Sequence, residues 1–83
     1  MKLNLALRVK DDPTDDVWRR TVERPYAGVP AVGDWVFLDD EGTKAKPVTR
    51  VTWSNEGEVT LGFGAVDETP ESIHAFGFAR ADL

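Results

Sequence analysis

Residues 32–40, Val-Gly-Asp-Trp-Val-Phe-Leu-Asp-Asp, form the most apolar short run in the chain and decide how we expect it to fold. Turn-forming residues bracket this run, with Gly33-Asp34 near its start and Asp-Asp-Glu-Gly at 39–42 after it, so a strand is predicted between them. At 35–38 both alternating faces of the strand are apolar, which is typical of a strand in the middle of a sheet or barrel. We therefore expect the other segments to fold onto it.

The composition describes one small acidic domain, residues 1–83. The chain has fifteen acidic and ten basic residues, a formal net charge of −5, no cysteine and a single histidine. It therefore offers neither a disulfide framework nor a Cys/His cluster for structural zinc, and its stability must come from apolar packing. The negative charge disfavours a nucleic-acid backbone or an anionic membrane as the partner.

The first ten residues resemble a signal peptide only superficially, because apolar and polar residues alternate and charge returns at Arg8. No apolar run approaches transmembrane length, so we expect a soluble cytoplasmic protein that binds no membrane. The absence of Gln and the abundance of Ala, Val, Arg and Asp indicate a GC-rich genome, and we expect a bacterial source.

Two strands are predicted before the central run. At 3–9 a leucine or valine stands at every second position, so one face of this strand is buried and the other is solvated. The aspartates and proline of 11–16 then predict a solvated turn. At 17–26, Trp18 and Val22 share one face, and the β-branched residues and missing helical stripe favour a strand over a ten-residue helix.

Two more strands are predicted after the central run and a polar loop at 43–47. Apolar residues alternate at 48–53 and again at 58–64, and the intervening Ser-Asn-Glu-Gly predicts a hairpin in which Gly57 takes a positive φ. The small residues on the second face of 58–64 allow close packing against that strand.

The tail supports two interpretations. Thr69 and Pro70 resemble a helix start, and Gly77 with Phe78 resembles a helix end with its apolar contact. Alternation at 73–78 would instead fit a strand. We prefer a short helix at about 70–76, followed by an extended tail that docks Phe78.

Five short strands and one late helical turn predict a mainly β domain, either a small five-stranded antiparallel barrel or a strongly bent sheet. Gly33-Asp34-Trp35-Val36, followed by an acidic glycine turn, a strand, a hairpin and a further strand, resembles the core of SH3-like barrels such as KOW and Tudor-type domains. The resemblance covers residues 32–63 and implies a fold, not a function. The long N-terminal hairpin departs from the SH3-like pattern.

Residues for the common kinds of catalysis are scarce. With one histidine, no cysteine and only Ser54 and Ser72 as serines, the chain lacks an evident nucleophile, base and orienting group. No Walker or dinucleotide-binding glycine pattern is present, and the acids at 11–16 and 39–41 lack the spacing of a calcium loop. We therefore expect no enzyme, no cofactor and no metal site.

One candidate surface for partner binding is the strand at 3–9. If this long, regular strand lies at a sheet edge, Leu3, Leu5 and Leu7 mark the segment that pairs with a partner's strand or with a second copy of the chain. This interpretation predicts a dimer that dissociates when a charge replaces Leu5 or Leu7.

A second candidate surface is basic. Arg19, Arg20 and Arg24, with Trp18 available for base stacking, would form a face for nucleic acid. Because acids are interleaved with these bases, cross-strand charge pairs are the simpler explanation.

A third arrangement is an aromatic cage. Trp35, Trp53, Tyr26 and Asp34 combine rings with a carboxylate, the groups that hold a methylated ammonium. Because the tryptophans lie in apolar strands of a domain short of core residues, packing is the favoured interpretation. Replacing Trp35 by Ala should then cost on the order of 2–5 kcal/mol.

Together these patterns favour a non-catalytic protein-interaction or accessory module whose partner is another protein or a second copy of the chain. The alternative is a nucleic-acid-associated module that uses the basic face. A weaker alternative is a small ligand-binding protein or hydrolase that works through acids the sequence does not single out. The sequence alone does not identify the partner.

Overall fold

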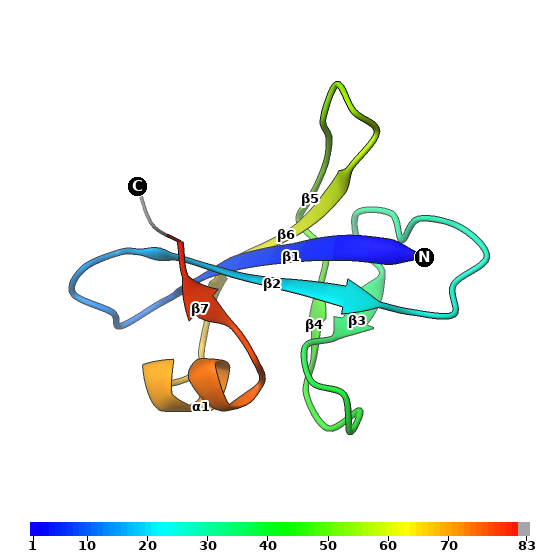
Figure 1. Cartoon of the computed structure of the whole chain (residues 1–83). Coiled ribbons are helices and arrows are strands. Elements are labelled where there is room, and N and C mark those ends of the chain that lie inside the picture. Colours follow the sequence, from blue (N-terminus) through cyan, green and yellow to red (C-terminus); the bar gives the residue numbers. More distant parts are fainter. Residues whose placement is uncertain (82–83) are drawn as a thin grey trace.

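The computed structural model describes residues 1–81 and folds them into strands and one short helix. In chain order the elements are β1 (Lys2–Val9), β2 (Val17–Glu23), β3 (Trp35–Phe37), β4 (Ala45–Pro47), β5 (Arg50–Trp53), β6 (Val59–Val66), α1 (Pro70–Ala75) and β7 (Ala79–Arg80). Five strands form one sheet in the order β5-β6-β1-β2-β7, and β3 pairs with β4 in a separate two-stranded ribbon. In Figure 1 both α1 and this ribbon lie beneath the sheet.

The sheet is mixed and open. β1 runs parallel to β6 and antiparallel to β2, while β5 and β7 occupy the two edges. The predicted antiparallel arrangement is therefore wrong for the β1–β6 pair, and the predicted barrel is not confirmed because the five-stranded sheet does not close. The mainly β class and the late helical turn are confirmed. The resemblance to SH3-like barrels stays a prediction.

β1 is a central strand of the sheet. It is paired with β2 on one side and with β6 on the other, and Leu3, Leu5 and Leu7 are each at most 2% exposed. The prediction that these leucines form an interaction edge is therefore wrong, because both edges of β1 are already paired within the sheet. The alternation of apolar and polar residues correctly predicted that one face of β1 is buried, but it did not predict that β1 has a neighbouring strand on each side.

A bulge in β6 keeps the end of this strand in phase with the core. The pairing register between β1 and β6 shifts midway along the strands, and Gly64 adopts φ +69°. Simple alternation after Phe63 would direct Ala65 inward, but the additional residue directs Val66 inward instead, where it is 4% exposed. The bulge thus places Val66 in the core instead of the smaller Ala65.

The tail folds as predicted into a capped helix and a docked phenylalanine. Thr69 is the N-cap of α1 and accepts a hydrogen bond from the third residue beyond it. At the other end Gly77 adopts φ +98°, and the Phe78 N–H donates to the Ile73 carbonyl at 3.2 Å, as in a Schellman motif. Phe78 and Ile73 are 1% and 0% exposed, so the helix end is anchored in the core.

Residues 45–53 pass from the ribbon into the sheet instead of forming a loop and one strand. β4 pairs with β3, β5 pairs with β6, and the buried Val48 lies where the chain changes partner. The hairpin predicted after this segment is confirmed, with Gly57 at φ +82°. β2 ends at Glu23, earlier than the predicted boundary at 26.

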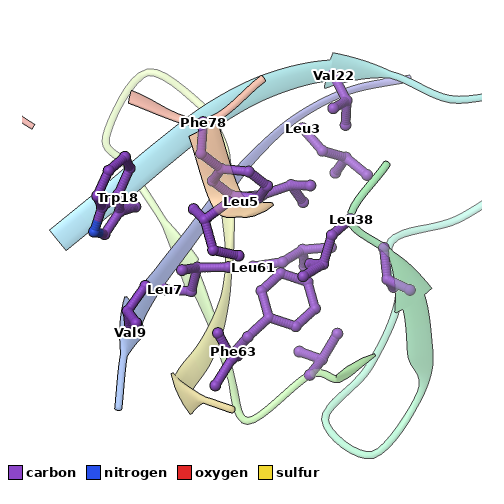
Figure 2. Packing of buried hydrophobic residues seen from close by; sticks show 14 of the residues in the cluster. Leu3, Leu5, Leu7, Val9, Trp18, Val22, Leu38, Leu61, Phe63 and Phe78 are labelled. Carbon is purple, nitrogen blue, oxygen red and sulfur yellow. The ribbon is translucent and has the colours of Figure 1, made fainter. Parts of the chain in front are cut away.

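The core lies between the sheet and the layer formed by α1 and the ribbon, as Figure 2 shows for its main side chains. β3 contributes Val36, which is 2% exposed, whereas Trp35 is 68% exposed. The prediction of a central strand with Trp35 buried is wrong, because β3 has one neighbouring strand and packs only one face on the core. The core consists of Leu3, Leu5, Leu7, Val9, Trp18, Val22, Val36, Leu38, Val48, Val59, Leu61, Phe63, Val66, Ile73 and Phe78.

Candidate interaction surface

Two of the three arginines assigned to the basic face are used inside the fold. Arg20 donates from Nη1 to the Leu38 carbonyl at 2.7 Å and from Nη2 to Asp40 Oδ1 at 2.6 Å. Arg24 donates from Nη1 to the Phe37 carbonyl at 3.1 Å, and its side chain is only 12% exposed. These bonds fasten the end of β3 to the region of β2, so Arg20 and Arg24 position the ribbon.

Trp18, assigned above to base stacking, lies in the core beside a buried acid. Its Nε1 lies 3.4 Å from Asp12 Oδ2, and the Arg80 guanidinium lies over its ring, 4.4 Å from the centroid. The same carboxylate accepts hydrogen bonds from the Thr14 hydroxyl and from Arg80, both at 2.8 Å. Asp12 therefore ties β7 to the turn after β1, and the prediction of a fully solvated turn at 11–16 is wrong at this residue.

The surroundings of Asp12 favour its charged form. The hydrogen bond from the Thr14 hydroxyl has the largest effect, and the Thr14 N–H, Arg80 and Trp18 act in the same direction. Burial opposes them, but together they lower the pKa of Asp12 to about 2. Burial acts to lower the pKa of Arg80, but its hydrogen bonds and charge attraction to Asp12 and Asp16 outweigh burial and raise that pKa, so Asp12 and Arg80 both stay charged at neutral pH.

Asp39 has a similar structural role in the turn after β3. It is 3% exposed, and its carboxylate accepts hydrogen bonds from the Thr43 N–H and hydroxyl and from the Lys44 N–H. Burial acts to raise the pKa of Asp39, but these hydrogen bonds outweigh it and lower the pKa. Over residues 1–81, no group of three or more His, Asp or Glu side chains is arranged to hold a metal ion.

Arg19 is exposed and lies on the opposite face of the sheet from Trp18, because neighbouring residues in a strand alternate. The set of Arg19, Arg20, Arg24 and Trp18 is therefore divided between the solvated face of the sheet, the ribbon contact and the core. It does not form the single basic and aromatic surface that the sequence suggested.

The outer face of the β3–β4 ribbon is apolar and open to solvent. Trp35 pairs with Pro47 and Phe37 pairs with Ala45, so these four side chains share the face that points away from the core. Trp35 and Phe37 are 68% and 44% exposed, and Pro47 and Ala45 are half-buried. Phe37 was not identified from the sequence as a binding residue, although it stands two positions after Trp35 and therefore points to the same face of the strand.

Pro47 fits in this ribbon without losing a ladder hydrogen bond. The Val48 N–H donates to the Asp34 carbonyl at 2.8 Å, and hydrogen-bonded and non-hydrogen-bonded pairs alternate along antiparallel strands. The neighbouring Trp35–Pro47 pair is therefore of the non-hydrogen-bonded kind, where proline's missing N–H is tolerated. Side chains of such pairs lie close together, so Pro47 and Trp35 are direct neighbours on the outer face.

A shallow groove of about 620 Å³ runs beside Trp35 and is lined by residues 25–30 and 34–36. Tyr26, Asp34 and Trp35, three of the four residues considered for an aromatic cage, line it together. Trp53 is 60% exposed but belongs to β5 and does not line this groove. The structure thus brings Tyr26, Asp34 and Trp35 together in the lining of one groove.

The residues weighed for catalysis have ordinary structural surroundings. Ser54 Oγ accepts hydrogen bonds from the N–H groups of Glu56 and Glu58 at 3.2 and 3.1 Å, which stabilises the β5–β6 hairpin turn. His74 is an exposed residue near the end of α1. Ser54 is thus a turn residue.

No family model, curated protein or solved structure matches the chain. Within residues 1–81, no helix is long and apolar enough to cross a membrane.

Proposed function

We propose that this chain is a non-catalytic protein-interaction module that binds its partner through the outer face of the β3–β4 ribbon. The observation that carries the proposal is the exposure of Trp35 and Phe37 on that one face. Together they leave on the order of 200–300 Å² of aromatic surface in water. Aromatic residues are enriched at the centres of protein interfaces, so two exposed rings on one face favour an interaction surface.

The ribbon is held in place before any partner arrives. Arg20 and Arg24 bind the carbonyls at the end of β3, and Lys46, on the ribbon's inner face, donates to Glu68 Oε2 at 3.1 Å. Asp39 closes the turn that joins the two strands. A surface that is rigid in the free protein loses less conformational entropy on binding.

A protein partner fits this face better than nucleic acid does. All four side chains on the face are uncharged, the chain carries a net charge of −5, and nucleic-acid affinity depends largely on basic contacts to phosphate. The partner is either a different protein or a second copy of this chain. Either kind of partner would cover Trp35 and Phe37.

The test compares the wild-type chain with the Trp35→Ala/Phe37→Ala double variant. Proteins captured from an extract of the source organism are identified and purified, and their Kd is measured by titration calorimetry. We expect the double variant to bind at least about 100-fold more weakly, because central aromatic residues carry most of an interface's binding energy. Sedimentation velocity on both chains tests the second copy as partner.

Trp53→Ala is the matched control, since Trp53 is about as exposed as Trp35 but lies on β5. It should retain the wild-type Kd, and far-UV circular dichroism should show all chains folded. If the double variant keeps the wild-type Kd for every captured protein, the face is not the interface. The proposal would also be overturned if the wild-type chain is a monomer and captures no protein.

A further inference from the structure

The groove beside Trp35 has fixed walls. On one side, Tyr26 and Val29 pack against the core. The residue just before this wall, Arg24, is held by a reciprocal pair of hydrogen bonds to Met1. The Arg24 N–H donates to the Met1 carbonyl at 2.9 Å, and the Met1 amino group donates to the Arg24 carbonyl at 2.7 Å. On the other side, β3 is fastened by the arginines described above. A ligand therefore meets a preformed groove.

Asp34 is the charged residue in the groove lining, and among residues 1–81 no cation pairs with it. Its Oδ2 accepts a hydrogen bond from the Ala31 N–H at 2.9 Å, and within residues 1–81 no basic group lies at salt-bridge distance from it. Asp12, Asp40 and Glu68, by contrast, each pair with a lysine or arginine. The groove thus presents an exposed carboxylate that is free to pair with a cation of a ligand.

We propose that this groove binds an arginine side chain of the partner, an inference that rests on the proposed function. The aliphatic part of the arginine packs against Pro25 and Pro30, its guanidinium stacks on the exposed indole of Trp35, and its N–H groups donate to Asp34 Oδ1. The residues that supply these groups all line the same groove. Cation–π attraction and a charge-assisted hydrogen bond then act on one group.

The shape of the groove favours a guanidinium over an ammonium. Trp35 is 68% exposed and the groove is shallow, so a ligand is covered from one side and not enclosed. A planar guanidinium stacks on a single open ring and still directs several donors sideways to a carboxylate. An ammonium is a compact, strongly hydrated charge, and a methylated one is recognised by an enclosing set of rings.

The experiment is an NMR titration of the ¹⁵N-labelled full chain with N-acetyl-arginine methylamide. We expect saturable shifts at the Trp35 indole N–H and the Asp34 amide, with a Kd on the order of 10 mM for so small a probe. The citrulline analogue has the same shape without the charge, so it should bind about fivefold more weakly or worse. The lysine and trimethyllysine analogues test the preference for a guanidinium.

Asp34→Asn should weaken arginine binding by about fivefold, because the ion pair is lost. The amide oxygen can still accept the Ala31 N–H, so the turn is retained. Trp53→Ala is the control and should bind like the wild type. The proposal is overturned if arginine gives no saturable shifts, if citrulline binds equally well, or if trimethyllysine binds more tightly than arginine.

Failure of this inference is distinguishable from failure of the proposed function. If the arginine probe does not bind, but the Trp35→Ala/Phe37→Ala variant still loses a purified partner, the ribbon face is the interface and only its arginine specificity is wrong. If that variant keeps its partner, the proposed function fails regardless of the titration.

Discussion

Alanine at Val36 should destabilise the fold more than alanine at Trp35, although tryptophan is by far the larger side chain. Val36 is 2% exposed, so Val36→Ala removes two buried methyl groups at about 0.8 kcal/mol each and leaves a small cavity, for a total of about 2 kcal/mol. A chain of 83 residues has a total stability of roughly 4–12 kcal/mol, so the loss is readily measured.

Trp35 is 68% exposed, which leaves about a third of its surface hidden, on the order of 80 Å². At about 25 cal/mol per Å² this would be about 2 kcal/mol. Alanine retains the backbone and Cβ part of the hidden surface, and area estimates of this kind are upper bounds. We therefore expect Trp35→Ala to cost about 1 kcal/mol or less.

The measurement is urea unfolding of both variants and the wild type, followed by far-UV circular dichroism so that loss of tryptophan fluorescence does not interfere. Equal slopes with urea concentration would show that the unfolded states are comparable. A Trp35→Ala variant that loses as much stability as Val36→Ala, or more, would mean that the indole belongs to the core. The ribbon would then have no exposed aromatic face to offer a partner.

Three further perturbations follow from the packing. The pKa of Asp12 in the folded chain is about 2, below the usual value of 3.8. The charged Asp12 carboxylate therefore stabilises the fold above about pH 4, and this stabilisation is lost as the pH falls toward 2. Urea midpoints should decline across this window more steeply for the wild type than for Asp12→Asn. Gly77→Ala should lower the free energy of unfolding, measured in urea, by about 1–2 kcal/mol, because Gly77 has a φ of +98° and a Cβ there would lie 3.0 Å from Arg20 Nε. An unchanged free energy of unfolding would contradict the described helix end. Leu5→Asp should abolish cooperative unfolding instead of dissociating a dimer, since Leu5 is fully buried; a folded monomer, seen by circular dichroism and light scattering, would refute this.

Segments whose conformation depends on near neighbours were predicted well. The cap at Thr69, the left-handed Gly77 and the docked Phe78 follow from residues within a few positions of one another, and all are found. The buried face at 3–9 was likewise evident from alternation. Such features depend on local backbone preferences and periodicity, which any window of the sequence contains.

The candidate site was only partly visible in the sequence. Tyr26, Asp34 and Trp35 were recognised as a combination of rings and a carboxylate, and the structure places them in one groove. Trp53 was included on composition alone and lies on another strand. Arg20 and Arg24 were weighed as part of a nucleic-acid face, with charge pairs as the simpler explanation. Arg20 does pair with Asp40, but both arginines also donate to carbonyls at the end of β3, which a linear pattern does not identify.

By itself, the sequence determined the capped start and the glycine end of the late helix, the hairpin turn at Gly57, and which face of β1 is apolar. Only the tertiary structure decided that β1 is central and that Trp35 faces water. The reason is that neighbours come from distant segments: β1 pairs with β6, and Asp12 meets Arg80 across 68 positions. A strand with two apolar faces buries both only if another layer covers each face. The core covers only the Val36 face of β3, so the face that carries Trp35 and Phe37 stays in water.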